Sequence, residues 1–175
     1  MARTLERLRR AFERLLELIV IFLMVVLAAE VTLGTAYRTF GAPLVWYDEV
    51  ASVLLAWLTY YGSALAALKR AHIGFPGLVA ALPPAMRLPL TLLGECLVIG
   101  FFALLAWVGW QVLGVLATDT LVTLPEVSVA YTQSVIPIGA GLYILAELFN
   151  LPRVLREARG LAARDSGEGA LELTH

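Results

Sequence analysis

Residues 88–117 read LPLTLLGECLVIGFFALLAWVGWQVLGVLA, and this stretch decides the fold. Glu95 is its only charged residue. A helix of about 20 apolar residues crosses the ~30 Å hydrocarbon core of a bilayer, and the run lacks the polar and apolar alternation of barrel strands. Comparable stretches cover 15–37, 50–68 and 129–151. We therefore predict an all-α integral membrane protein with four transmembrane helices.

The composition supports a membrane location. The chain has 175 residues, of which 60% are hydrophobic and 15% charged, and its mean hydropathy is +0.82. A soluble domain of this size needs more polar surface, so the apolar excess must face lipid or other helices. The connecting segments are too short for a separate domain. We expect one membrane domain over 1–151, a cytoplasmic tail over 152–175, and neither an internal repeat nor a broken helix.

The basic residues indicate the orientation. Of the 13 lysines and arginines, five precede the first span, three lie between the second and third spans, and four follow the fourth. Arg38 alone lies on the opposite side. The positive-inside rule assigns the side that is rich in basic residues to the cytoplasm. We predict a multi-pass protein with both termini in the cytoplasm.

The segment before the first span has one apolar face and one basic face. Its apolar residues recur at steps of three or four and are Leu5, Leu8 and Phe12. The basic face carries Arg3, Arg7, Arg10 and Arg14. A helix of this kind lies flat among lipid headgroups. We predict an interfacial amphipathic helix over 3–14 that bends near residues 14–17; the alternative is a straight extension of the first span into water.

Three acidic residues lie inside the predicted spans: Glu30, Glu95 and Glu147. An unpaired charge at such depth costs about 2.5–3.5 kcal/mol, so each acid should face protein or have a partner. The functional interpretation is a proton or ion relay, and the structural one is helix pairing or subunit contact. We favour the structural interpretation because the spans hold no second Asp or His at a matching depth.

Basic residues at the span ends are candidate partners for these acids. Glu95 and Glu147 lie on the side where Lys69, Arg70 and Arg87 emerge, and we expect a cluster of ion pairs there. Arg38 is the only candidate for Glu30, about two turns further along the helix.

Motifs of soluble enzymes are absent from the sequence. It contains no phosphate-binding glycine loop, no HExxH and no GxSxG. Cys96 is the single cysteine and His72 stands alone between two spans, so no metal cluster is predicted. We expect no enzyme activity, no catalytic residue, no cofactor, no metal and no nucleic-acid partner. Gly62 belongs to a small-residue face that suits close helix packing.

Several short motifs resemble the small permease subunit of tripartite ATP-independent periplasmic (TRAP) transporters. They are Trp46-Tyr47-Asp48-Glu49, then Trp57 and Gly62, then Arg70-Ala71-His72-Ile73, and finally Tyr131 with Pro137-Ile138-Gly139. The resemblance covers about 14–151. One departure is visible, because the family commonly has an acidic residue after His-Ile and this chain continues with Gly74.

The resemblance implies a partner-dependent role in the bacterial inner membrane. In that family a large permease subunit holds the substrate and sodium sites, and a periplasmic binding protein delivers an organic anion such as a carboxylate. The four-helix subunit is similar to a static scaffold. The candidate contact residues are Trp46, Glu49, Trp57, Gly62, Arg70, His72, Pro137 and Gly139. We expect Glu49, in the first turn of its helix, and Trp46, at headgroup level, to anchor the outer end.

Two other classes compete with the scaffold. A self-contained proton-coupled exporter or channel would use Glu30 as its coupling acid in a homo-oligomer. A membrane-embedded enzyme is the weaker rival, because no cytoplasmic connector contains a cluster of Asp, His and Arg.

Overall fold

The structure is a computed structural model, and it describes residues 2–71 and 83–158. Its helices are α1 (Ala2–Thr39), α2 (Tyr47–Leu68), α4 (Pro84–Leu116), α5 (Val129–Gln133) and α6 (Val135–Ala158). The described residues form no β-sheet; they contain one isolated bridge, between Thr120 and Ser128. The predicted helical class is therefore confirmed.

Among the described residues, four segments are long and apolar enough to cross a membrane, as predicted. They are Leu5–Thr39, Tyr47–Leu68, Met86–Leu116 and Val129–Arg156. We call the end at which α1 begins and α2 ends the inner end, and the opposite end the outer end. That the inner end is cytoplasmic stays a prediction from charge.

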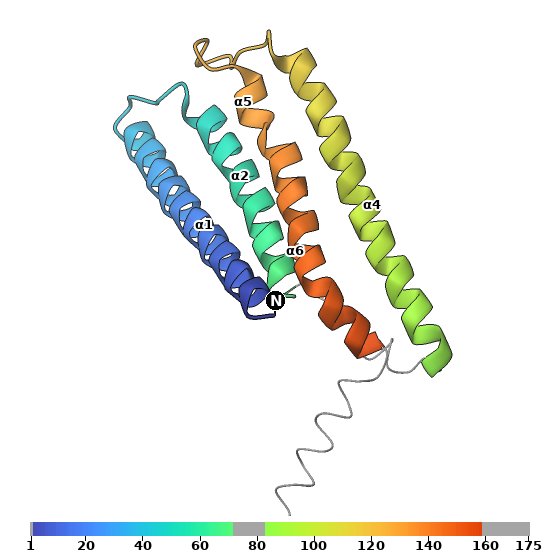
Figure 1. The fold of residues 1–175 in the computed structure, drawn as a ribbon. Helices are drawn as coiled ribbons and strands as arrows, with labels where there is room; N and C mark the ends of the chain where they lie inside the picture. Colours follow the sequence, from blue (N-terminus) through green and yellow to red (C-terminus); the bar gives the residue numbers. More distant parts are fainter. Residues whose placement is uncertain (1, 72–82, 159–175) are drawn as a thin grey trace, which may run out of the picture.

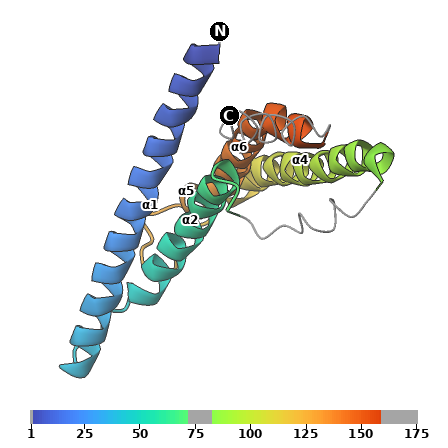
Figure 2. The ribbon, with the colours of Figure 1, turned by 90° about the horizontal axis from the view of Figure 1, so that it is seen from below.

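The helices form an open row in the order α1, α2, α6, α4 (Figure 1). Neighbours in the row pack along their lengths, whereas α4 makes no comparable contact with α1 or α2. Seen from below, α1 and α2 run in a different direction from α4, so the row is bent and does not close into a bundle (Figure 2). One side of α4 is consequently left without a neighbour among residues 2–71 and 83–158.

The core lies where α1, α2 and α6 meet near the inner end. Leu16, Ala64, Leu68, Tyr143 and Ala146 are buried there against one another. The alanines allow the backbones of α2 and α6 to approach closely. Gly62 does not take part, because a Cβ at this position would contact no neighbouring atom of the described chain.

The first helix corrects one prediction. Residues 3–14 are not a separate interfacial helix, because α1 continues from Ala2 to Thr39 without a break at residues 14–17. Leu16 is 1% exposed in the core, and the ring of Phe12 packs 5.8 Å from that of Phe149. This packing and the absence of Gly or Pro near residue 14 favour a continuous helix. The straight-extension alternative therefore matches the structure.

Candidate functional site

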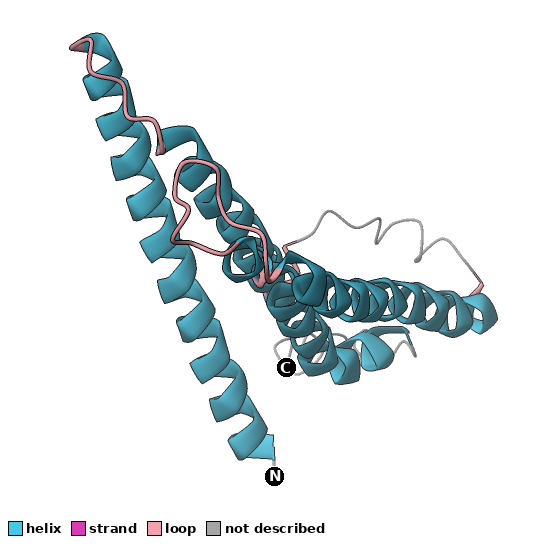
Figure 3. Ribbon diagram, turned by 90° about the horizontal axis from the view of Figure 1, so that it is seen from above, coloured by secondary structure: helices cyan, strands magenta, loops and turns pink. Residues whose placement is uncertain are grey.

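Glu49 organises the outer end of the chain. Its carboxylate accepts hydrogen bonds from the backbone N–H groups of Val122 and Thr123, both at 2.8 Å, and from the Thr123 hydroxyl. The loop between α4 and α5 thereby folds over the start of α2 (Figure 3). The sequence predicted an anchoring role for Glu49, and the partner that the structure provides is this loop. Trp46, the residue before α2, remains 38% exposed beside it.

Trp57 joins the middle of the row to a break in the fourth span. Its indole Nε1 donates a hydrogen bond of 2.8 Å to the carbonyl oxygen of Thr132. In an unbroken helix that oxygen would accept from Ile136, but α5 ends at Gln133 and α6 begins at Val135. Pro137 contributes to the break, because its ring clashes with the carbonyl of Gln133, four residues earlier, and it has no N–H to donate to that oxygen. The expectation of no broken helix was therefore wrong.

Gly139 and Gly109 allow α6 to lie close to both neighbours. A Cβ on Gly139 would lie 2.8 Å from Cβ of Tyr60 in α2. A Cβ on Gly109 in α4 would lie 3.2 Å from Cδ of Pro137. Both distances are too short for a side chain without movement of the neighbour. Pro137 and Gly139 thus act in helix packing at the level of the break.

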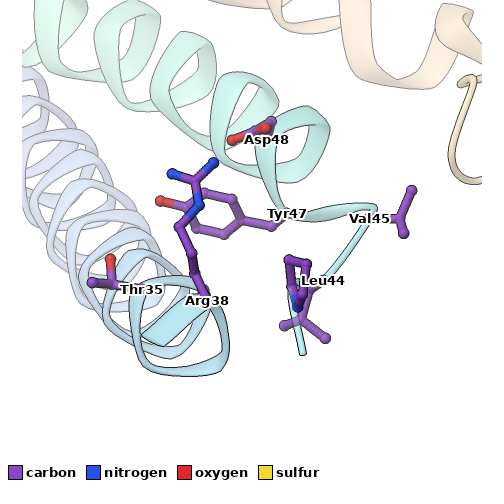
Figure 4. A pocket seen from close by; sticks show the side chains of 8 residues that line it. Thr35, Arg38, Leu44, Val45, Tyr47 and Asp48 are labelled. Atoms are coloured by element: carbon purple, nitrogen blue, oxygen red, sulfur yellow. The ribbon is translucent and has the colours of Figure 1, made fainter. Parts of the chain in front are cut away.

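Glu30 is buried between the first two helices. It is 8% exposed, and neither carboxylate oxygen has a hydrogen-bond partner in the part of the chain that the structure describes. Arg38, its predicted candidate partner, instead extends along the ring of Tyr47 toward Asp48 (Figure 4). These side chains border a cavity of about 170 Å³ at the outer end. The Tyr47 ring lies against Gly34, one turn from Glu30, where any side chain would collide with it.

The inner end has a different ion-pair arrangement from the predicted one. Lys69 pairs with Glu17 and, at 3.8 Å, with Glu13, both in α1. The hydrogen bond with Glu17 raises the pKa of Lys69 above its ordinary value. Arg9 adds a hydrogen bond of 3.1 Å to the carbonyl oxygen of Leu68. The first helix is therefore tied to the end of α2, and Lys69 is not the partner of the intramembrane acids.

Glu95 and Glu147 have partners nearer to them. Arg70 interacts electrostatically with Glu95, as the sequence predicted. Glu147 accepts a hydrogen bond from the Tyr143 hydroxyl one turn earlier.

Arg70 follows the C-cap of α2, and its backbone adopts the left-handed conformation, with φ of 52°. The N–H of Arg70 bonds to Ala67 and that of the next residue to Ala66, a Schellman arrangement in which glycine is the usual residue.

A model of the family described as "Tripartite ATP-independent periplasmic transporters, DctQ component" matches residues 28–157. The chain belongs to the DctQ family. It is also 28% identical over 156 residues to the sialic acid TRAP transporter small permease protein SiaQ of Vibrio cholerae serotype O1 (strain ATCC 39315 / El Tor Inaba N16961). That alignment covers 86% of this chain and 89% of the relative. The resemblance to TRAP small permease subunits is thus confirmed.

The DctQ family match includes five of the motif residues: Trp46, Glu49, Trp57, Pro137 and Gly139. Each of them except Trp46 makes a contact described above inside this chain. The family is one of transporter components and not of enzymes. His72 lies outside the described residues, so its predicted contact has no structural test. Residues before 28 lie outside the match.

Sequence reasoning missed two contacts of this DctQ chain. Asn150 is 2% exposed and donates a hydrogen bond of 2.8 Å to the carbonyl oxygen of Ala67. The rings of Phe102 and Tyr143 stack with centroids 3.7 Å apart, joining α4 to α6. A polar Asn within an apolar span was a readable signal, because a buried amide requires a partner. Nothing in the sequence alone pairs the two rings.

Proposed function

We propose that this DctQ-family protein docks to a large permease subunit and acts as its fixed membrane scaffold. The observation that carries the proposal is the family match over residues 28–157. The large subunit would hold the substrate and a sodium ion, and a periplasmic binding protein would deliver an organic anion such as a carboxylate. The complex would lie in a bacterial inner membrane with both termini of this chain in the cytoplasm.

The side chains of α4 support docking. Phe101, Leu104, Trp107 and Trp110 are each more than half exposed, and no other described helix of the open row covers them. The helix is apolar on every side, which is typical of a segment covered by lipid or by other helices. Docking of a larger membrane subunit would cover part of this surface.

The broken fourth span supports a scaffold more than a transport site. Transporters use the free backbone groups of discontinuous helices to coordinate ions and substrates. Here the carbonyl freed at Thr132 is taken by the Trp57 indole. At this carbonyl, the break fixes α2 to α6 and leaves no free acceptor for an ion.

Reconstitution in liposomes tests the proposal. The chain alone, a large TRAP permease subunit alone, and both together are compared under a sodium gradient, with the binding protein and a panel of labelled carboxylates. We expect uptake above empty liposomes only when both membrane subunits are present. Uptake by this chain alone would overturn the scaffold proposal.

A second candidate function is that of a self-contained proton-coupled exporter, with Glu30 as its coupling acid. A buried carboxylate without a hydrogen bond is the specific observation in its favour, because acids inside membranes often serve proton relays. Proton-driven export by the chain alone that disappears in Glu30→Gln would support the exporter. Under the scaffold proposal, the same variant leaves sodium-driven uptake by the complex within about twofold of wild type.

A further inference from the structure

An apolar groove lies between α1 and α2 on the surface that faces the membrane. Its volume is about 370 Å³. The lining residues are Leu18, Ile19, Phe22, Leu23, Trp57 and Tyr61. Leu18 and Phe22 are about two-thirds exposed, whereas Leu23 at the base is buried. The groove is therefore open to the lipid phase, with a closed floor.

Contacts on both sides hold the groove in shape. The Trp57 indole is fixed by its hydrogen bond to Thr132, and the Tyr61 ring lies 6.3 Å from it. Below the groove, Lys69 ties α2 to Glu13 and Glu17 of α1. The two helices are thus joined at the inner end. The groove between their large side chains is therefore a fixed feature of the packing of α1 against α2.

A basic residue lies just below the groove toward the inner end. Arg14 is one helical turn before Leu18, about 6 Å along the axis, and it is exposed. It has no hydrogen-bond or ion-pair partner within 2–71 and 83–158. The nearby acids Glu13 and Glu17 are engaged by Lys69. Arg10, one turn further, donates to the backbone carbonyl of Glu6 in its own helix.

We propose that this groove binds an anionic phospholipid of the inner leaflet. One acyl chain lies along Leu18 and Phe22 against Trp57 and Tyr61, and the phosphate is held by Arg14 with support from Arg10. The arrangement fits a phospholipid because the unpaired charge of Arg14 lies one helical turn from the apolar groove. A phosphate headgroup lies at a similar distance from the start of its acyl chain. A partner helix in the groove would instead need an acidic residue at the level of Arg14.

Photolabelling of the full chain in nanodiscs tests the lipid site, independently of the proposed function. Phosphatidylglycerol and phosphatidylcholine analogues with a diazirine on the acyl chain are compared at equal mole fraction. We expect phosphatidylglycerol to label the groove peptides about fivefold more than phosphatidylcholine, as about 1 kcal/mol of attraction from Arg14 implies. The preference should disappear in Arg14→Gln, and Ile19→Trp should reduce labelling by both analogues by filling the groove.

The exposed surface of α4 around Leu97 and Leu104 is the matched control, since it is apolar but has no arginine one turn away. Labelling there should be equal for the two lipids. Equal labelling of the groove by both lipids, or an unchanged preference in Arg14→Gln, would show bulk lipid only. Loss of groove labelling when the large subunit is added would show a protein contact there. Each of these results overturns the proposal.

Discussion

Two side chains at the outer half of the molecule bind backbone groups far along the chain. Glu49 accepts from the N–H groups of Val122 and Thr123, and Trp57 donates to the carbonyl of Thr132. These groups have no partner in a regular helix, and the Thr132 carbonyl, which lies within the fourth span, needs an internal partner because the bilayer core offers no water. Glu49 and Trp57, which belong to the motifs that resemble the family, therefore stabilise the fold of this chain directly.

Trp57→Phe should lower the free energy of unfolding by about 1 kcal/mol, because the Thr132 carbonyl loses its donor while the aromatic packing is largely retained. Unfolding in mixed micelles with increasing SDS measures the change. Trp110→Phe in α4 is the control, since that ring is 71% exposed and should give a shift near zero. Equal shifts for the two variants would rule out a special role for the Trp57 hydrogen bond.

The helices are joined by close backbone approaches on both sides of α6. Gly139 lets α6 lie against Tyr60, and Gly109 lets α4 lie against Pro137. Asn150 and the stacked pair of Phe102 and Tyr143 complete the contacts toward the inner end. The fourth span is consequently the central element of the row, with α2 on one side and α4 on the other.

Gly139→Ala should destabilise the protein by about 1–3 kcal/mol, because the new methyl group overpacks against Tyr60. Helix propensity alone predicts the opposite sign, a gain of up to about 1 kcal/mol. Gly141→Ala is the matched control in the same helix, since a Cβ there meets no atom within 4 Å. The same micelle titration decides between the two effects, and stabilisation by both variants would refute the close contact.

At the scale of the whole molecule, the open row leaves α1 and α4 at opposite edges (Figure 1). A self-contained channel needs helices that enclose a path, whereas this row presents broad apolar surfaces on both sides. The continuous first helix also extends past the end of α2, and its first turns carry Arg7, Arg9, Arg10 and Arg14 at the inner end. The arrangement suits a subunit that is completed by a partner and by lipid.

The orientation can be tested with single cysteines in a Cys96→Ala background. We expect a membrane-impermeant maleimide to label Glu126→Cys, in the outer loop, when it is applied from the periplasmic side. Ala2→Cys should react only after the inner membrane is permeabilised, because the positive-inside rule puts the N-terminus in the cytoplasm. Labelling of Ala2→Cys from the periplasmic side would reverse the predicted topology.

The sequence by itself determined the four spans and their approximate limits, because hydropathy and helix length are local properties. The motifs around Glu49, Trp57 and Pro137 were also sufficient to indicate the family. The residues do not show in advance that Lys69 pairs with α1 or that Glu49 binds a loop more than 70 positions away. Those pairings depend on which helices are neighbours.

Only the tertiary structure decided the order of the row and the straight course of the first helix. An apolar helix such as α4 has no face that specifies a neighbour by periodicity, so its position follows from shape, through Gly109 and Phe102. The first helix has an amphipathic pattern that suits a membrane surface, but its burial of Leu16 and its ion pairs with Lys69 favour a straight course. Packing between segments distant in the chain outweighed the local pattern.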